Sequence, residues 1–169
     1  MIHLSIDRIN EKSNYLVVLT PYGEFNFLTD LGIKYTVCFE AEQPLGGCET
    51  YQFIIRRKQT NTHPPHDPKV RQTILTIIQE FFAEHTNVLL YMCDDSDGRE
   101  ANRHRLFLNW FQMNTDHDRF TIRTAHAVIE DKGFYAAIIV ENRNPMLNDI
   151  IDDFEATAKA LTEGKPETK

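Results

Sequence analysis

The chain has 169 residues, of which 41% are hydrophobic, so it is long enough and apolar enough to bury the core of one domain. Its 25 acidic residues outnumber 18 basic ones, and the formal net charge of −7 excludes a general affinity for nucleic acid, because phosphate binding depends on clustered Lys and Arg. No apolar run approaches the roughly 20 residues of a membrane span, and three cysteines without a CxxC pattern favour a reducing cytoplasm over a disulfide framework.

The first third of the chain alternates apolar and polar residues, which is typical of strands that bury one face. The apolar positions are Phe25 and Phe27, then Ile33, Tyr35, Val37 and Phe39, and finally Tyr51, Phe53 and Ile55. Short turns at Pro21–Gly23 and Thr29–Gly32 predict an antiparallel meander, with a first strand at Tyr15–Leu19. A looser connection is expected at Gln43–Gly47, and His3–Ile6 is expected to add an edge strand.

A polar linker with three prolines, Lys58–Pro68, follows the meander. It ends in Asp67-Pro68, a side chain suited to cap a helix followed by a proline suited to its first turn. The next apolar residues recur at spacings of three and four; they are Val70, Ile74, Ile77, Ile78, Phe81 and Phe82. We therefore expect an amphipathic helix that runs to about His85 and packs on the sheet.

An apolar run, Val88–Cys93, predicts a strand that is buried on both faces. The polar turn Asp94–Gly98 follows this strand and opens a second helix. Beyond that helix, Arg119–Glu130 and Phe134–Val140 are expected to form two strands. A hairpin turn at Asp131–Gly133, with its glycine at positive φ, is expected to join them.

The last helix is expected to begin at Asn144-Pro145 and to end at Gly164. Its apolar stripe consists of Leu147, Ile150, Ile151, Phe154, Ala158 and Leu161. A strand meander followed by helix, strand, helix, hairpin and helix predicts an α+β fold, with a single mixed sheet and helices packed on it. Because no internal repeat and no dividing linker is present, residues 1–164 are expected to form a single domain and residues 165–169 a flexible C-terminal tail.

The most informative stretch for function joins the end of the Val88–Cys93 strand to the second helix, because open sheets bind ligands where strands end. Each helical residue advances by about 100° around the axis, which assigns a core-facing stripe to Leu106, Phe107, Trp110 and Phe111. Arg99 and Arg103 are expected to share this stripe. Three carboxylates lie just upstream and can pair with the two arginines; they belong to Asp94, Asp95 and Asp97.

Three interpretations of this locus stay open. In the structural one, a side chain of the turn caps the helix and Asp–Arg pairs join the strand end to the helix. In the second, Asp94, Asp95 and Asp97 bind a divalent cation such as Mg²⁺, although their spacing matches no complete metal loop and Arg99 competes for the same oxygens. In the third, the helix N-terminus with Arg99 and Arg103 holds a phosphate or a carboxylate.

Other residues with chemical potential have a structural interpretation. His126 shares its strand parity with Ile122 and Val128 and is expected to point into the core. Cys93 stands beside the acidic turn, where neighbouring carboxylates disfavour a thiolate. The run Arg56–Lys58 is expected to be a solvated strand edge. Neither a Walker loop nor a GxGxxG pattern is present, so no cofactor is expected.

Two stretches of the chain resemble a known family. They are Phe27–Phe39, FLTDLGIKYTVCF, and Leu90–Phe111, LYMCDDSDGREANRHRLFLNWF. In them the chain resembles a family of small uncharacterised bacterial proteins of unknown function, and the similarity extends from about Tyr15 to Phe154. The resemblance implies a bacterial origin. It carries no activity and no site residue.

Two functional hypotheses follow. The first is a cytoplasmic protein-interaction domain, in the manner of an antitoxin or an immunity protein, since no recognisable catalytic set is present and the negative charge suits a basic partner. The second is an enzyme or a binding domain for a phosphate-bearing ligand at the strand–turn–helix locus Asp94 to Arg105. There Arg99 and Arg103 would hold the anion, and Asp94 or Asp97 would hold a metal or act as a general base.

Overall fold

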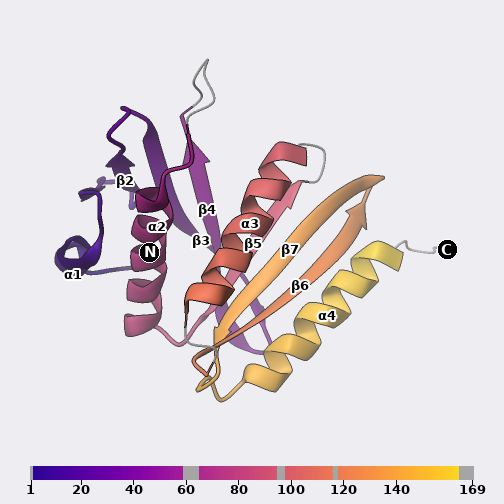
Figure 1. Ribbon diagram of the computed structural model, residues 1–169. Helices are drawn as coiled ribbons and strands as arrows, with labels where there is room; N and C mark the ends of the chain where they lie inside the picture. The colour runs from indigo at the N-terminus through magenta and orange to yellow at the C-terminus, as the bar shows by residue number, and fades with distance from the viewer. Residues whose placement is uncertain (1, 59–64, 95–97, 116–117, 164–169) are drawn as a thin grey trace. The chain divides into compact units, whose positions relative to one another are not determined.

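The computed structural model describes residues 2–58, 65–94, 98–115 and 118–163, with the backbone alone at residues 84, 94, 98–104, 114 and 163. In this part of the chain, four helices accompany one mixed sheet of seven strands in the order β1-β2-β3-β4-β5-β7-β6, which confirms the α+β prediction (Figure 1). The elements are α1 (Ile6–Lys12), β1 (Val17–Leu19), β2 (Phe25–Leu28), β3 (Lys34–Leu45), β4 (Cys48–Arg57), α2 (Pro68–Glu84), β5 (Val88–Asp94), α3 (Gly98–Asn114), β6 (Phe120–Ile129), β7 (Lys132–Glu141) and α4 (Leu147–Glu163).

The fold divides into two compact units, and the long strands β3 and β4 contribute to both. Unit 1 comprises Met1–Glu40 and Phe53–His85, and unit 2 comprises Ala41–Gln52 and Thr86–Lys169. That residues 1–164 form a single domain stays a prediction. The predicted tail at residues 165–169 and the helix end at Gly164 lie outside the described residues.

The strands of unit 1 bury one face under helix α2. The register of the antiparallel meander pairs Val17 with Phe27 and Phe27 with Tyr35, so that apolar residues of three strands share one face. Helix α2 packs on this face, where the ring of Phe81 stacks on that of Phe39 with centroids 5.2 Å apart. The alternating pattern of the sequence therefore predicts the buried face of these strands correctly.

Both helices of unit 1 begin at a capping side chain. Asp67 caps α2, as predicted, because its Oδ1 accepts the backbone N–H two residues on at 2.9 Å. Ser5 caps α1 in the same way, and its Oγ accepts the backbone N–H of Arg8 at 3.2 Å. The predicted edge strand at His3–Ile6 is wrong: the chain turns into a helix there, which buries Ile9 while its charged neighbours face solvent.

The β3–β4 hairpin is longer than the sequence indicated. A loose connection over Gln43–Gly47 is wrong, because β3 continues to residue 45 and the chain reverses at Gly46 and Gly47, with φ of 58° and 79°. In unit 2 this tip fits tightly against α4. The backbone N–H of Gly46 donates to Oδ2 of Asp153 at 2.8 Å, and a Cβ added at Gly46 would lie 2.5 Å from the backbone nitrogen of Ile150.

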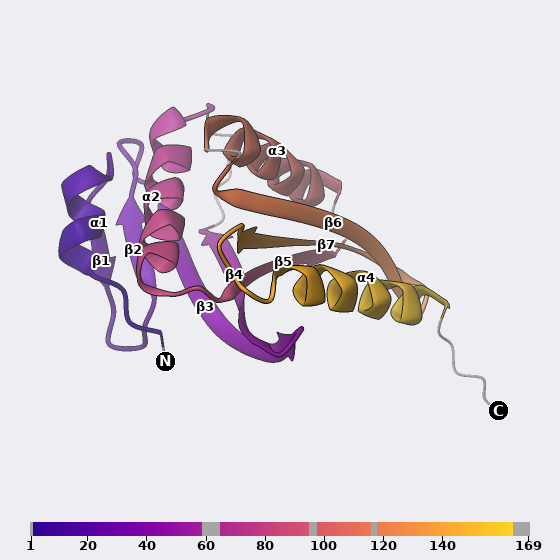
Figure 2. The ribbon, with the colours of Figure 1, turned by 90° about the horizontal axis from the view of Figure 1, so that it is seen from below.

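In unit 2, helices α3 and α4 lie on opposite faces of the strands (Figure 2). Ile150 and Phe154 of α4 form a buried cluster with Val88 of β5 on one face. On the other face, Phe111 of α3 lies against Phe120 with ring centroids 5.5 Å apart. The sheet is parallel between β4 and β5 and antiparallel between β5 and β7. Because helices cover both faces, Val88, Leu89, Tyr91 and Cys93 of β5 are buried, as the sequence predicts, whereas Met92 is 38% exposed.

The core-facing stripe of α3 differs from the predicted one. The buried residues are Phe107, Leu108 and Phe111, whereas Leu106 is 55% exposed and Trp110 is half-buried. The reason is that apolar side chains occur on several sides of this helix, so its periodicity does not select one stripe. Packing against the sheet makes the selection.

Two details of the β6–β7 hairpin also correct the sequence analysis. Ile129 pairs with Lys132, so the turn consists of Glu130 and Asp131, at φ of 53° and 65°, and the expected glycine at positive φ is wrong. Two residues at positive φ are typical of a turn that matches the twist of the strands. His126 is exposed on the edge strand β6 and not in the core.

Candidate functional site

The strand–turn–helix locus forms where the sequence predicts it, since β5 ends at Asp94 and α3 begins four residues later. Asp95 and Asp97 lie outside the described residues, and the side chains of Asp94, Arg99 and Arg103 are not described. The ligand-binding and the structural interpretations of these five residues therefore stay predictions. The prediction that Arg99 and Arg103 face the core depends partly on Leu106 as a member of the core-facing stripe. Because Leu106 is exposed, it does not support that prediction.

A row of chemically active side chains crosses the strands beside this locus. The register pairs Cys93 of β5 with Tyr135 of β7, and Tyr135 with His126 of β6. The guanidinium carbon of Arg105 lies 4.9 Å from the centroid of the Tyr135 ring, and the His126 ring meets the same ring edge-on at 5.5 Å. Tyr135 is not recognisable as a site residue from the sequence, because only the strand register brings it to the end of β5.

The Tyr135 phenol in this row stays protonated at neutral pH. Burial of the phenol raises its pKa, nearby Arg105 lowers it, and Cys93 raises it again. Cys93 is itself buried. The face of the Tyr135 ring attracts the guanidinium of Arg105 that lies over it, and this cation–π interaction holds the Arg105 side chain in place. The row therefore positions Arg105.

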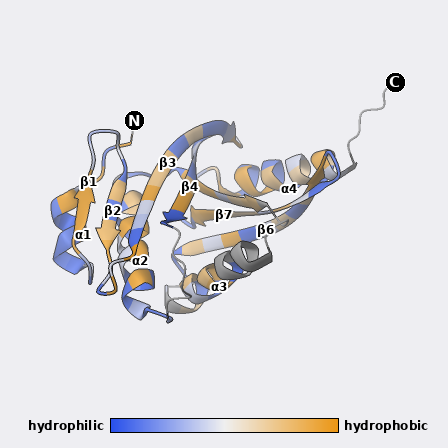
Figure 3. Ribbon diagram, turned by 90° about the horizontal axis from the view of Figure 1, so that it is seen from above, coloured by the Kyte–Doolittle hydropathy of each residue, from blue (hydrophilic) through white to orange (hydrophobic). Residues whose placement is uncertain are grey.

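A second candidate, here named the basic hollow, lies in unit 1 at the open end of the β3–β4 hairpin. Among the described residues it is lined by four cations and one hydroxyl, and its volume is about 410 Å³. The lining residues are Lys34, Thr36, Arg56, Arg57 and Lys58. The tip of β4 is correspondingly hydrophilic in Figure 3.

Strand pairing explains why three of the four cations converge; Arg57, which also lines the hollow, has the opposite strand parity. The backbone N–H of Lys58 donates to the carbonyl of Lys34 at 2.9 Å, which places the two lysines opposite each other. Because successive side chains of a strand alternate between faces, Thr36 on β3 and Arg56 on β4 share the face of these lysines. Thr36 Oγ1 donates to Oδ1 of Asn26 on β2 at 2.8 Å, which fixes the hydroxyl at the floor of the hollow.

The cations of the basic hollow have little internal compensation. Glu24 lies 3.8 Å from Arg56, and both side chains are exposed, so this ion pair is weak. Among the residues that the structure describes, no carboxylate pairs with Lys34, Arg57 or Lys58. Like charges this close repel each other, and a bound anion relieves the repulsion. Carboxylate and phosphate are the anions that guanidinium groups bind best.

Buried Cys38 forms part of the surroundings of the basic hollow. Nη1 of Arg56 lies 3.8 Å from its sulfur. Burial raises the pKa of the Cys38 thiol, and the charge of Arg56 partly counteracts this by lowering it. The thiol therefore remains protonated and contributes no negative charge to the site.

Only half of the basic hollow is visible in the sequence. The run Arg56–Lys58 is apparent there, and its pattern predicts a solvated strand edge. Lys34 precedes this run by more than twenty residues, and only the hairpin pairing brings it alongside. The predicted antiparallel pairing of the two strands, if extended to the polar residues at their ends, would place Lys34 beside this run.

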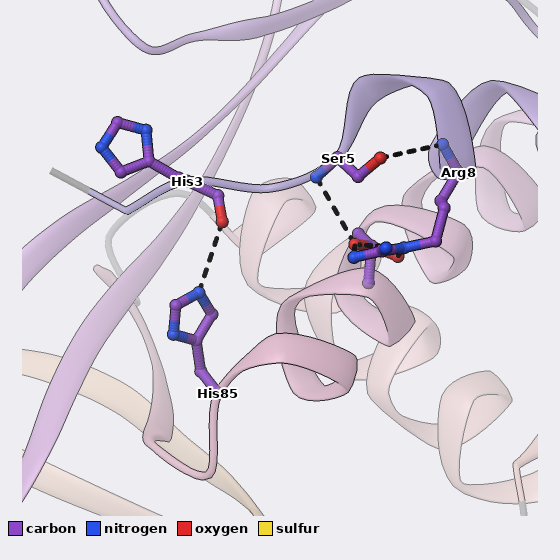
Figure 4. Close-up of polar contacts among 5 residues, drawn as sticks. His3, Ser5, Arg8 and His85 are labelled. Carbon is purple, nitrogen blue, oxygen red and sulfur yellow. Dashed lines mark hydrogen bonds and ion pairs between the residues drawn. The ribbon is translucent and has the colours of Figure 1, made fainter.

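Other buried acids are already paired and stabilise the fold. In unit 1, the guanidinium of Arg8 donates to both oxygens of Glu80 at 2.7–3.1 Å, which ties α1 to α2. Figure 4 shows Arg8 beside the Ser5 cap, together with the contact between Nε2 of His85 and the carbonyl of His3, which is longer at 3.4 Å. Such a satisfied carboxylate has no lone pair to spare for a ligand.

Unit 2 contains a comparable acid at the end of β7. Buried Glu141 accepts hydrogen bonds from Nε of Arg119 at 3.2 Å and from Nε of Arg143 at 3.1 Å. Within the described residues, no group of three or more His, Cys, Asp or Glu side chains is placed to hold a metal ion. The helices in the same part of the chain include none that is long and apolar enough to span a membrane.

The chain is similar to a protein family over more than half of its length. A family model described as a family of unknown function, DUF6169, matches residues 66–156. No curated protein and no solved structure matches the chain significantly. The matched range contains the Asp94 to Arg105 locus and Tyr135, and it begins after the last residue of the basic hollow.

Proposed function

We propose, from the premise that the chain belongs to the DUF6169 family of unknown function, that it is an interaction domain that holds an anionic group of a protein partner in the basic hollow. The observation that carries this proposal is the convergence of four cations on one hollow, with a single weak carboxylate contact at 3.8 Å among the described residues. The net charge of the chain is −7, yet four cations lie together in this hollow, and their mutual repulsion costs free energy.

The local charge, and not the net charge, decides which partner fits at contact. Charges interact over a Debye length of about 8 Å at physiological ionic strength, and more distant charges are largely screened. The net charge of −7 favours a basic partner during the approach, but the groups that meet the partner in the hollow are cations. An acidic group therefore fits the hollow.

The setting of this function is part of the proposal. All three cysteines are free thiols, which is consistent with the reducing cytoplasm expected from the sequence. A bacterial source and an antitoxin- or immunity-like role, in which the domain masks an acidic surface of a partner, complete the proposal.

Binding of a fluorescently labelled polyglutamate peptide, measured by fluorescence anisotropy, tests the anion-binding function. The double variant Lys34→Glu/Arg56→Glu should bind at least about tenfold more weakly than the wild type, since it reverses two of the four charges. Lys12→Glu/Arg123→Glu is the matched control: it makes the same change in net charge at exposed residues outside the hollow. It should retain binding to within about twofold.

Thermal unfolding of both variants verifies that they fold. Binding to the wild type should weaken steadily as salt is raised, because the interaction is ionic. Equal weakening in both double variants, or no binding by the wild type at low salt, would overturn the proposal.

A second candidate function, binding of a phosphate-bearing ligand at the Asp94 to Arg105 locus, is supported by a separate observation. Arg105, near the middle of α3, is held over the ring of Tyr135 at 4.9 Å, in the range that the family model matches. Titration with inorganic pyrophosphate, followed by NMR, should shift amide signals of α3 in the wild type and not in Arg105→Gln. Shifts that are the same in both proteins would exclude this site.

A further inference from the structure

Exposed apolar side chains lie next to the basic hollow on the same face of unit 1. The register pairs Leu28 of β2 with Lys34, and it aligns Val18 of β1 with Asn26 and Thr36. Val18 is 54% exposed and Leu28 is 60% exposed, and Leu16, two residues before Val18, is 72% exposed. The open face is thus apolar at Leu16, Val18 and Leu28, polar at Asn26 and Thr36, and basic at Lys34, Arg56 and Lys58.

The edge of β1 is closed to strand addition. The side chain of Asn10 bonds to both backbone groups of Val17: Nδ2 donates to the carbonyl at 2.9 Å, and Oδ1 accepts the N–H at 2.7 Å. This arrangement occupies the groups through which an incoming strand would pair. A partner must therefore dock on the face of these strands and not along their edge.

We infer that this face docks an acidic protein segment that also carries apolar side chains. The inference rests on the proposed function and adds the chemistry of the partner: acidic groups enter the basic hollow while leucine-like side chains cover Leu16, Val18 and Leu28. Neighbouring strands lie about 4.8 Å apart, so one segment spans both halves of the face. A short amphipathic helix presents acidic and apolar groups at this spacing.

Magnitudes favour a mixed segment over a purely acidic one. Exposed ion pairs are weak individually, so a purely acidic ligand dissociates readily from the hollow. Burying a half-exposed leucine under a partner raises the affinity for that partner by about tenfold. The apolar residues beside the hollow, Leu16, Val18 and Leu28, can provide this gain.

Two other classes of anionic partner fit less well. Single-stranded nucleic acid is bound through bases stacked on exposed aromatic rings, but Phe25 and Phe27 of β2 are buried, and exposed Tyr22 lies in the turn between β1 and β2, not on the strands that carry the hollow. Nucleic acid and anionic membranes extend beyond the hollow, so they also meet the acidic residues that give the chain its net charge of −7. A short acidic segment presents few charges and meets only the hollow.

Four probes of stated composition test this inference by fluorescence anisotropy or vesicle co-sedimentation. They are a helical peptide of Glu and Leu, a polyglutamate peptide of equal length, a single-stranded DNA oligonucleotide, and vesicles of phosphatidylserine and phosphatidylcholine. The wild type should bind the Glu/Leu peptide at least about tenfold more tightly than polyglutamate. DNA and vesicles should bind more weakly than the Glu/Leu peptide.

The variant Val18→Ser/Leu28→Ser should lose the preference for the Glu/Leu peptide and keep its binding of polyglutamate. Val128→Ser/Leu161→Ser is the matched control, because it removes two exposed apolar side chains of unit 2 and should keep the preference. If polyglutamate binds through Lys34 and Arg56 without any preference for the Glu/Leu peptide, the inference fails and the proposed function stands. Tighter binding of DNA or vesicles also overturns the inference. If neither acidic peptide binds, the proposed function fails with it.

Discussion

The strands of the two units are covered differently, and the sequence pattern of each unit follows from this. In unit 1 helix α2 covers one face of the strands, and the opposite face carries the basic hollow and exposed Val18 and Leu28. In unit 2 helices α3 and α4 cover both faces. Strands with one covered face alternate in hydrophobicity, and strands with two covered faces do not. An open face is available for binding, so the alternating region contains the best-defined candidate site.

Truncation of neighbouring residues in each unit gives the largest expected effects and tests this contrast directly. In β2, Phe27→Ala should lower the free energy of unfolding by about 3–5 kcal/mol, because Phe27 is buried. Leu28→Ala should lower it by less than about 0.5 kcal/mol, because Leu28 is exposed. In β7, Ile138→Ala and Ile139→Ala should each cost about 2–5 kcal/mol, because both side chains are buried. Urea unfolding of the four variants measures these values. A neutral Ile138→Ala or a severe Leu28→Ala would contradict the contrast.

The hairpin tip in unit 2 allows a sharper comparison between two adjacent glycines. Gly46→Ala should destabilise by about 2–5 kcal/mol, because the new Cβ combines positive φ with a 2.5 Å clash against the backbone of α4. Gly47→Ala, with φ of 79° and no atom within 4 Å of the Cβ, should cost only about 1–2 kcal/mol. Thermal unfolding of the two variants checks the order. Equal losses would show that the tip does not press on α4 in solution.

Alkaline pH provides the smallest effect and compares one buried tyrosine of each unit. Burial is the main cause that raises the pKa of both Tyr15 and Tyr135. The pKa of each phenol is higher in the folded chain than in the unfolded chain, where it is about 10. The contribution of each buried phenol to the free energy of unfolding is therefore fully present below pH 10, and it is lost as the pH rises through the pKa of the folded state. Tyr135→Phe should therefore flatten the fall in stability above about pH 10, as measured by urea unfolding at a series of pH values.

The tyrosine of unit 1 serves as the comparison variant. Its hydroxyl donates to Oδ2 of Asp67 at 2.5 Å and accepts the N–H of Asp30 at 3.2 Å. Tyr15→Phe should flatten the alkaline fall as well, but it also removes both hydrogen bonds and should lower stability at neutral pH. If Tyr135→Phe leaves the alkaline curve of the wild type unchanged, burial of Tyr135 is not linked to folding.

Most of the fold could be predicted because it depends on local signals. The Asp67 cap and the spacing of apolar residues in α2 identify that helix, and the continuous run from Val88 identifies β5. The errors fall where local signals are short or ambiguous. Helix α1 has only seven residues, and α3 carries apolar side chains on several sides, so packing decided the buried stripe.

The candidate sites were less predictable than the fold. The run Arg56–Lys58 is visible in the sequence, but its opposition to Lys34 requires the hairpin register. Likewise, Tyr135 meets Arg105 only because β7 pairs with β5 and α3 covers that face. Both sites join residues that are distant along the chain, and composition alone carries no information on such pairs.

The sequence by itself determined the α+β class, the helix cap at Asp67 and the doubly covered strand at Val88–Cys93, since periodicity and capping act between residues close in the chain. The tertiary structure decided which cations converge and which faces stay open. Strand register and helix docking are set by packing between distant segments, and one residue of register shift moves every side chain to the other face.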